Sequence, residues 1–354
     1  MTRIAVLGAG AGGCAAAVDF VQRGAEVRLY NRSAERLEPV RSQGGLRVNG
    51  PLINDFVKIP LITSRLEEAV GGADLIWILT TAHGHAHYAE ALAPHLAEGQ
   101  TIVLSPGSAG SLVMRQILRA RGVRARVHLV ETLTLPAAAR ILEPGTVTVY
   151  TRIRLRTAAL PGKETAAAIA RLSAFIDAIP ATNVLELTLL NPNYLVHPVP
   201  YLMNLGEIER SEGIFAIYAL GWTPSVLKTM HAIDGEKMAV CRALGLSAFP
   251  IDTVYEEFGT GPIYRQSAAA LKTRTETIPK VEGRFLDEDV PLALVTLASL
   301  GRMVGVPTPV SDAVIQLAST VQSVDYWTSG RTVEALGIAG RTPEALRRYL
   351  HEEA

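Results

Sequence analysis

Residues 4–13 have the sequence Ile4-Ala5-Val6-Leu7-Gly8-Ala9-Gly10-Ala11-Gly12-Gly13 and decide the fold class. A short apolar run, typical of a buried strand, ends in glycines at positions 8, 10 and 13 and leads into a helix-forming segment. Gly8 permits a tight turn, Gly10 lets a pyrophosphate approach the backbone, and Gly13 lets the helix pack closely on the strand. The N–H groups and dipole at the start of that helix attract an anion. The pattern predicts a dinucleotide-binding loop. The alternative is a small-residue turn that binds nothing.

Short apolar runs alternate with helix-like segments through the first part of the chain. Each run is nearly continuous, as in strands that are buried on both faces of a parallel sheet. This alternation predicts an α/β domain with a doubly wound parallel sheet, the Rossmann fold. The predicted strands are Ile4–Leu7, Glu26–Tyr30, Leu75–Leu79, Thr101–Leu104 and Arg126–Glu131, and the predicted helices are Gly12–Gly24, Ser33–Gly44, Gly84–Leu96 and Gly110–Arg121.

The pattern changes in the second half of the chain. Thr146–Tyr150 and Arg152–Arg156 are predicted as a pair of added strands, and Lys163–Ile179 as a helix that Pro180 ends. After Leu187–Pro192 the remaining segments are helical and are separated by proline and glycine. We therefore expect two domains: a dinucleotide-binding domain over 1–188 and an all-helical substrate and catalytic domain over 189–354.

Composition excludes several classes of protein. The chain has 354 residues, 48% of them hydrophobic, which suits two folded domains. It has 34 basic and 34 acidic residues, and this lack of a basic excess argues against nucleic-acid or membrane-surface partners. No apolar run approaches the roughly 20 residues that a membrane helix needs. Two distant cysteines, Cys14 and Cys241, suit a reducing compartment, so we expect a cytoplasmic protein.

Three residues after the second predicted strand bear on cofactor choice. An enzyme that uses NAD usually has an acidic residue here, which binds the ribose 2′-hydroxyl and would repel a 2′-phosphate. This chain has Asn31, Arg32 and Ser33 instead. Because an arginine attracts a phosphate, Asn31 and Arg32 favour NADPH. NADH stays open as the alternative if Arg32 is only a solvated loop residue.

Histidines occur at alternate positions, His83, His85 and His87. Such residues would converge on a strand, but this segment enters a predicted helix, where positions two apart point in different directions. No nearby acidic residue or cysteine completes a metal site, so no metal is predicted. We interpret them as loop and helix-start residues near the cofactor.

A single histidine, His197, opens the second domain in the segment Asn193-Tyr194-Leu195-Val196-His197-Pro198. A lone histidine is usually a core residue, but polar groups follow this one, among them Asn204. Farther along, the acidic cluster that contains Asp289 precedes a helix. A carboxylate that holds an imidazole makes a proton donor. From composition alone, however, the acids are better explained as helix caps.

Several short motifs occur in order along the whole chain, and together they resemble the NAD(P)-dependent opine dehydrogenases of the octopine/nopaline dehydrogenase type. They are the glycine loop, Ser105-Pro106-Gly107-Ser108, Glu131-Thr132-Leu133-Thr134-Leu135-Pro136 ahead of Arg140, Asn193 with His197-Pro198, Asn204-Leu205-Gly206 with Glu207 and Glu209, Arg284 through Glu288-Asp289-Val290-Pro291, and Gly305-Val306-Pro307-Thr308-Pro309 ahead of Asp312.

The resemblance implies a function. In such enzymes an amino acid condenses with a 2-oxo acid, and hydride from the cofactor reduces the imine to an N-(carboxyalkyl) amino acid. The family's catalytic histidine corresponds to His197, its partner acid to Asp289, and its arginine for a substrate carboxylate to Arg284. We also predict substrate contacts for Asn193 and Asn204. The resemblance allows a homodimer.

The chain departs from the family pattern at one loop. Thr81 stands where many relatives have proline, and His85 matches a histidine that is common there, so we predict it as a cofactor contact. His83 and His87 are less expected. The cofactor-selecting position varies within the family, so the resemblance does not decide between NADP and NAD.

Two other functions compete with this one. A single-substrate ketoacid reductase, such as a ketopantoate reductase, shares a similar first domain but would need a catalytic lysine early in the second. The chain has no lysine between Lys163 and Lys228. A non-catalytic cofactor sensor would need the glycine loop but not His197, Asp289 and Arg284.

Overall fold

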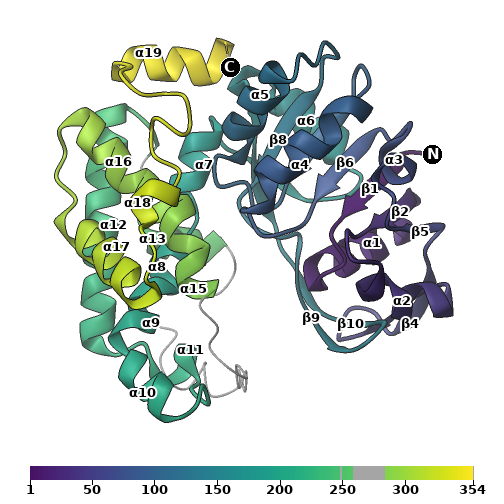
Figure 1. The fold of residues 1–354 in the computed structure, drawn as a ribbon, viewed down its shortest axis with the longest axis horizontal. Helices are drawn as coiled ribbons and strands as arrows, with labels where there is room; N and C mark the ends of the chain where they lie inside the picture. The colour runs from purple at the N-terminus through teal and green to yellow at the C-terminus, as the bar shows by residue number, and fades with distance from the viewer. Residues whose placement is uncertain (248, 258–283, 354) are drawn as a thin grey trace. The chain divides into compact units, whose positions relative to one another are not determined.

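The computed structural model describes residues 1–247, 249–257 and 284–353, without the side chains of residues 219 and 284. Its contacts divide the chain into two compact units (Figure 1). Unit 1 comprises Met1–Leu187 and the chain from Tyr349 onward, and unit 2 comprises Thr188–Arg348. The predicted division at 188/189 placed the C-terminus in the second domain, whereas η5 (Tyr349–Glu353) packs in unit 1. No helix among the described residues is long and apolar enough to cross a membrane.

Unit 1 is built on an eight-stranded sheet in the order β12-β11-β8-β7-β6-β1-β2-β5. The six strands from β8 to β5 are parallel, whereas β11 is antiparallel to β8 and extends the sheet. This is the predicted α/β sheet with an antiparallel addition. The strands are β1 (Arg3–Leu7), β2 (Glu26–Tyr30), β5 (Leu61–Thr63), β6 (Leu75–Ile78), β7 (Thr101–Leu104), β8 (His128–Thr132), β11 (Leu155–Leu160) and β12 (Ala178–Pro180).

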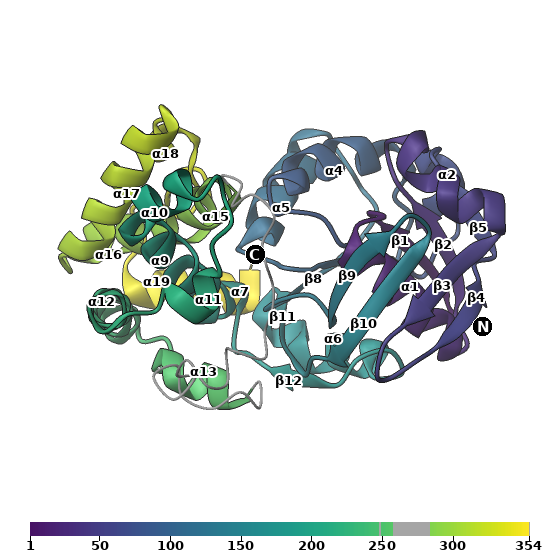
Figure 2. The same ribbon diagram turned by 90° about the horizontal axis from the view of Figure 1, so that it is seen from below.

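Unit 1 has a second sheet, in the order β4-β3-β10-β9. It packs on the side of helix α1 (Ala11–Gln22) that faces away from the eight-stranded sheet (Figure 2). At the centre of the shared core, the rings of Phe20 in α1 and Trp77 in β6 lie 4.7 Å apart. The sequence did not predict this sheet. Its strands are β3 (Gly45–Asn49), β4 (Asp55–Lys58), β9 (Ala137–Glu143) and β10 (Thr146–Arg152).

The structure corrects two sequence predictions in unit 1. Thr146–Tyr150 lies within strand β10 as predicted, and Arg152–Arg156 overlaps the start of β11. Their predicted pairing with each other is wrong, because β10 pairs with β9 and β3 while β11 joins the large sheet. The helix predicted over Lys163–Ile179 ends much earlier. The helices and 3₁₀ turns of unit 1 are α1 (Ala11–Gln22), α2 (Ala34–Gln43), α3 (Leu66–Val70), α4 (Gly84–Leu92), η1 (Ala93–His95), α5 (Gly110–Ala120), η2 (Gly162–Glu164) and α6 (Thr165–Leu172).

All elements of regular structure in the described residues of unit 2 are helical, with no strand among them, as predicted. The long helix α12 is central and contacts α8, α9, α16, α17 and α19. The helix α7 (Val184–Leu190) crosses the division between the units. The others are α8 (Asn193–Val196), α9 (Pro198–Met203), α10 (Leu205–Arg210), α11 (Ile217–Leu220), α12 (Pro224–Leu244), α13 (Ile251–Glu257), α15 (Arg284–Asp287), the π-helical turn η4 (Val290–Leu294), α16 (Val295–Val304), α17 (Pro309–Gln322), α18 (Tyr326–Ser329) and α19 (Pro343–Arg348).

Candidate active site

The glycine loop between β1 and α1 has the geometry of a dinucleotide site. Gly8 has φ +122°, a conformation that favours glycine. A Cβ on Gly13 would lie 1.8 Å from the Gly8 carbonyl oxygen, so only glycine lets the helix approach the loop. A Cβ on Gly10 would meet no atom within 4 Å, which leaves open space at the start of α1. The first turn of α1 has no acidic residue to compete for its N–H groups. The loop therefore fits a pyrophosphate.

Asn31 and Arg32 lie at the end of β2 and differ in their contacts. The Oδ1 atom of Asn31 accepts a hydrogen bond from the Ala9 N–H at 3.2 Å, which ties the glycine loop to β2. Arg32 is exposed and makes no hydrogen bond or ion pair with any residue that the structure describes. It lies near Tyr88, where burial raises the pKa to about 12 and the charge of Arg32 opposes the increase. The Arg32 guanidinium is therefore accessible to an anion.

The three histidines of the segment 83–87 point apart, as the helical prediction implies. His83 and His87 are exposed, whereas His85 is fully buried in the first turn of α4. A Cβ on Gly110 would lie 2.0 Å from the Nδ1 atom of His85, so the imidazole packs tightly on α5. His85, predicted as a cofactor contact, has no exposed surface in this structure, because it fills the contact between α4 and α5.

Glu131, at the carboxyl end of β8, holds the loop that follows β7, and sequence reasoning assigned it no role. This fully buried carboxylate accepts hydrogen bonds from the N–H groups of Ala109, at 3.0 Å, and Ser111, at 2.8 Å, and from the Ser111 hydroxyl. Ser108 and Ala109 have φ +48° and +57°, which is uncommon for residues other than glycine. The carboxylate satisfies the start of α5 and fixes this loop at the same edge of the sheet as the glycine loop.

In unit 2, prolines place His197 between two short helices. Pro198 lacks the backbone N–H that would continue α8, so α8 ends and α9 begins at His197. The His197 N–H still donates to the Asn193 carbonyl at 3.0 Å, and its carbonyl accepts from the Tyr201 N–H at 3.1 Å. These bonds fix the backbone at the junction. The imidazole is mostly buried, with 17% of the side chain exposed.

The structure brings His197 and Asp289 together. The Nδ1 atom of His197 lies 2.7 Å from the Oδ2 atom of Asp289, although the residues are 92 positions apart in the sequence. Asp289 precedes η4, but its side chain makes no capping hydrogen bond to that turn. The capping explanation therefore does not account for this side chain. A carboxylate at Nδ1 orients the ring and leaves Nε2 for exchanging a proton.

The π-helical turn after Asp289 is tied to a distant segment of the chain. Pro291 lacks a backbone N–H, and its carbonyl accepts a hydrogen bond from the Arg331 N–H at 2.8 Å. A Cβ on Gly330 would lie 2.9 Å from that carbonyl, so glycine allows the close approach. Irregular turns of this type are frequent at functional sites, and this one fixes the backbone next to Asp289.

Aromatic rings surround His197, and sequence reasoning missed them. The Phe285 ring centroid lies 4.5 Å from that of the imidazole, and the Tyr218 ring lies 6.2 Å away. The Tyr218 hydroxyl is 2.9 Å from the Nε2 atom of His197. Apolar ring faces lower the local dielectric, which strengthens the His197–Asp289 interaction. Tyr218 lies 21 residues after His197 on another helix, a distance at which no sequence periodicity gives a signal.

The other predicted substrate residues differ in their burial and contacts. Asn193 is half-buried one helical turn before His197. The amide group of Asn204 donates to the carbonyls of Pro200, at 2.7 Å, and Gly221, at 3.1 Å, so it joins α9 to the end of α11. Arg284 begins α15, but its side chain lies outside what the structure describes. No group of three or more potential metal ligands occurs in the described ranges.

Removing the Tyr218 hydroxyl tests its contact with Nε2. We expect Tyr218→Phe to lower kcat about fivefold, because one hydrogen bond at a reacting nitrogen contributes about 1 kcal/mol. Cofactor affinity should not change, since Tyr218 is in unit 2 and the glycine loop is in unit 1. Steady-state kinetics would measure the effect, with Tyr150→Phe, at an exposed position of β10, as the matched control. An unchanged kcat would show that this hydroxyl does not assist His197.

Comparison with known proteins identifies the family of the chain. The family model described as NAD/NADP octopine/nopaline dehydrogenase, alpha-helical domain, matches residues 180–322, and the model of ketopantoate reductase PanE/ApbA matches residues 4–149. An opine dehydrogenase of Arthrobacter sp. (strain 1C) is 34% identical over 97% of both chains. The chain belongs to the opine dehydrogenase family. It is an NAD(P)-dependent oxidoreductase, as the sequence resemblance predicted.

More distant relatives extend the match over the whole chain. Protein ocs of Agrobacterium tumefaciens (strain Ach5) is 26% identical over 99% of both chains. An octopine dehydrogenase solved with NADH and agmatine has a TM-score of 0.77 at 22% identity and covers 100% of this chain and 99% of its own. A yersinopine dehydrogenase with bound NADP⁺ has a TM-score of 0.70 at 18% identity, covering 100% and 98%. These structures confirm the fold of an opine dehydrogenase.

Proposed function

We propose that the protein catalyses the reductive condensation of an amino acid with a 2-oxo acid, through an imine, to an N-(carboxyalkyl) amino acid. The observation that carries this proposal is the 2.7 Å contact between His197 and Asp289, in the helical part of a chain that belongs to the opine dehydrogenase family. The condensation releases one water. Hydride then adds to the imine carbon and a proton to the nitrogen.

His197 would act as the acid–base group. With Nδ1 held by Asp289, only Nε2 can exchange a proton with a substrate. A protonated ring would polarise the carbonyl of the oxo acid during condensation, and Asp289 would balance its charge. The Tyr218 hydroxyl contacts the Nε2 atom of His197 in this structure. A bound substrate would therefore displace this hydroxyl or receive the proton through it.

Arg284 is our proposed contact for a substrate carboxylate, because a guanidinium binds a carboxylate with two parallel hydrogen bonds and fixes its orientation. Both reactants carry a carboxylate. Asn193, one turn from His197, would contribute a polar contact. Asn204 already uses its amide group within the fold, so we propose that it supports the site through α9.

The glycine loop at 8, 10 and 13 would hold the pyrophosphate of the cofactor, whose nicotinamide supplies the hydride when bound. Asn31 would act indirectly by fixing the loop through the Ala9 N–H. We propose NADPH as the preferred form, with NADH as the alternative, because the accessible Arg32 attracts a 2′-phosphate. A homodimer and a cytoplasmic location remain predictions from the sequence.

Reversing the charge of Arg32 tests the preference for NADPH. We expect Arg32→Asp to lower the ratio of kcat/KM for NADPH to that for NADH at least about tenfold, because a charge-assisted hydrogen bond is replaced by repulsion. The matched control is Arg41→Asp, which makes the same charge change at the far end of α2. An unaltered ratio in Arg32→Asp would remove this residue from cofactor selection.

Isotope transfer tests the proposed reaction itself. The enzyme would be incubated with both substrate classes and with reduced cofactor carrying deuterium at the transferable position, and the products analysed by mass spectrometry. We expect a secondary amine that contains both substrate skeletons and one deuterium. A deuterated 2-hydroxy acid without nitrogen would instead establish a ketoacid reductase, the function that the match of residues 4–149 would favour.

A further inference from the structure

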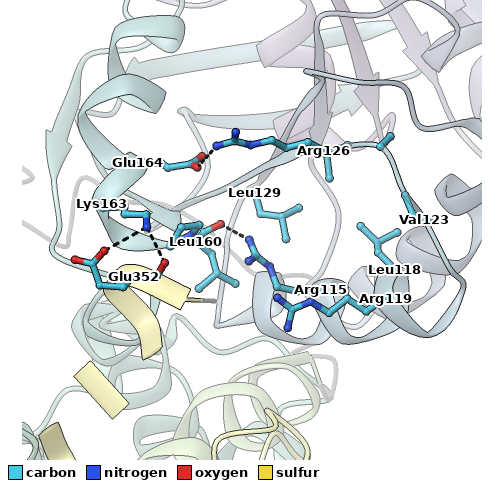
Figure 3. A pocket seen from close by; sticks show the side chains of 13 residues that line it. Arg115, Leu118, Arg119, Val123, Arg126, Leu129, Leu160, Lys163, Glu164 and Glu352 are labelled. Atoms are coloured by element: carbon cyan, nitrogen blue, oxygen red, sulfur yellow. Dashed lines mark hydrogen bonds and ion pairs between the residues drawn. The ribbon is translucent and has the colours of Figure 1, made fainter. Parts of the chain in front are cut away.

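A polar cavity lies in unit 1, away from the glycine loop (Figure 3). It has a volume of about 370 Å³, which lies within the range of small-molecule sites. Its walls come from the second half of α5, the chain before β8, the end of β11 and the C-terminal turn η5. None of these residues takes part in the proposed reaction.

The cavity and the dinucleotide loop lie at opposite edges of the sheet. The glycine loop follows the carboxyl end of β1, and β8 runs parallel to β1 through β6 and β7. The cavity is lined by Leu129 near the amino end of β8, paired with Leu160 at the end of the antiparallel β11. A molecule in this cavity would therefore not occupy the cofactor site.

Cations outnumber acids in the cavity wall. The lining includes Arg115, Arg119, Arg126 and Lys163 against only two carboxylates. Both carboxylates already have cationic partners. Glu164 pairs with Arg126 at 3.0 Å, and Glu352 pairs with Lys163 at 3.2 Å.

Arg115 and Arg119 supply the uncompensated charge. They are one turn apart on α5, and Figure 3 shows both side chains at the cavity. Arg115 donates to the Leu160 carbonyl, and the Arg119 side chain makes no hydrogen bond or ion pair with any described residue. Burial, together with the charge of Arg119, lowers the pKa of Arg115 to about 10. An anion between the two guanidiniums would favour the charged form of Arg115 and offset the repulsion between the two side chains.

We propose that this cavity binds a small oxyanion, a carboxylate or a phosphate group, between Arg115 and Arg119. Guanidinium groups match the planar or tetrahedral oxygens of these anions. Leu118 and Leu129 add apolar wall beside the cations, which suits a group carried on a short carbon skeleton.

Titration calorimetry on enzyme saturated with NADPH tests the proposal, because the cofactor excludes phosphate from its own site. Inorganic phosphate and succinate would be titrated separately, with sodium chloride at equal ionic strength as the reference. Arg119→Gln is the informative variant, since Arg115 also supports the Leu160 carbonyl. Arg171→Gln, at an exposed position of α6, is the matched control, and thermal unfolding would confirm that both variants fold.

We expect saturable binding of at least one anion to the wild type, with a Kd at least about tenfold higher in Arg119→Gln and unchanged in Arg171→Gln. Binding of phosphate alone or of succinate alone would identify the preferred oxyanion. The proposal would be overturned if neither anion bound more strongly than chloride, or if Arg119→Gln bound both as the wild type does. It does not depend on the proposed reaction.

Discussion

Replacing His197 by alanine is expected to lower kcat by at least about 10²-fold, the usual contribution of a positioned general acid. The substitution removes the Nε2 atom that would exchange the proton and leaves Asp289 without its partner. Affinity for the reduced cofactor should stay at the wild-type value, because the glycine loop belongs to unit 1 and His197 to unit 2. Steady-state kinetics and fluorescence titration of the cofactor would measure the two quantities.

A matched control separates chemistry from folding in this experiment. His231 is exposed on α12, so His231→Ala removes an imidazole from unit 2 without affecting the pair. His197→Asn, which keeps a polar group beside Asp289, should be as inactive as His197→Ala. A kcat above about a tenth of the wild-type value in either His197 variant would refute the proton-donor role.

Replacing Asp289 by asparagine is also expected to lower kcat by about 10²-fold or more, although the side chain keeps its shape. An amide at this position carries no charge to balance a protonated His197, and it can hold the imidazole in the wrong tautomer. The loss should not add to that of His197→Ala, because the residues act as one unit. Kinetics of both single variants and the double variant would give the coupling.

The neighbouring acid provides the control for Asp289. Glu288→Gln makes the same charge change one residue earlier and should keep most of the activity, since the contact to His197 comes from Asp289. If Asp289→Asn kept wild-type activity, or if its effect multiplied that of His197→Ala in the double variant, the pair would not be the acid–base unit.

The sequence predicted the central part of unit 1 because two local signals agreed there. Continuous apolar runs and glycine positions specify β1, β2, β6 and β7, and each is found close to its predicted bounds. The second sheet was missed because its strands are half exposed and carry residues such as Phe56 and Tyr150 on open faces. Their pairing joins β3 to β10, far apart in the chain, and no local pattern encodes this.

The error in the helix after Lys163 has a tertiary cause. The helical pattern continues past Leu172, where α6 ends. Phe175 then turns into the core and packs edge-on against Phe20, with ring centroids 5.7 Å apart. The next residues form β12 beside β11. Burial of an aromatic ring outweighs the weak preference of the segment for a helix.

The candidate site was predictable in part. Pro198 signals the helix break at His197, but the residues alone could not choose between a paired and a capping Asp289. Family resemblance supplied the pairing, and the structure brings the two side chains together. The roles of Tyr218 and Glu131 were not predicted, because they depend on contacts between segments that are distant in the sequence. Two signals for Glu131 were available in the sequence: it ends a strand predicted to be buried, where an acidic residue is unusual, and it begins one of the family's motifs.

The most direct test of the central claim follows oxidation of NADPH and NADH by absorbance, with a pool of 2-oxo acids, a pool of amino acids, or both. Reductive condensation predicts oxidation only when both pools are present, and separating the pools would then identify the two substrates. Equal oxidation with the 2-oxo acids alone would contradict the claim and establish reduction of a single substrate.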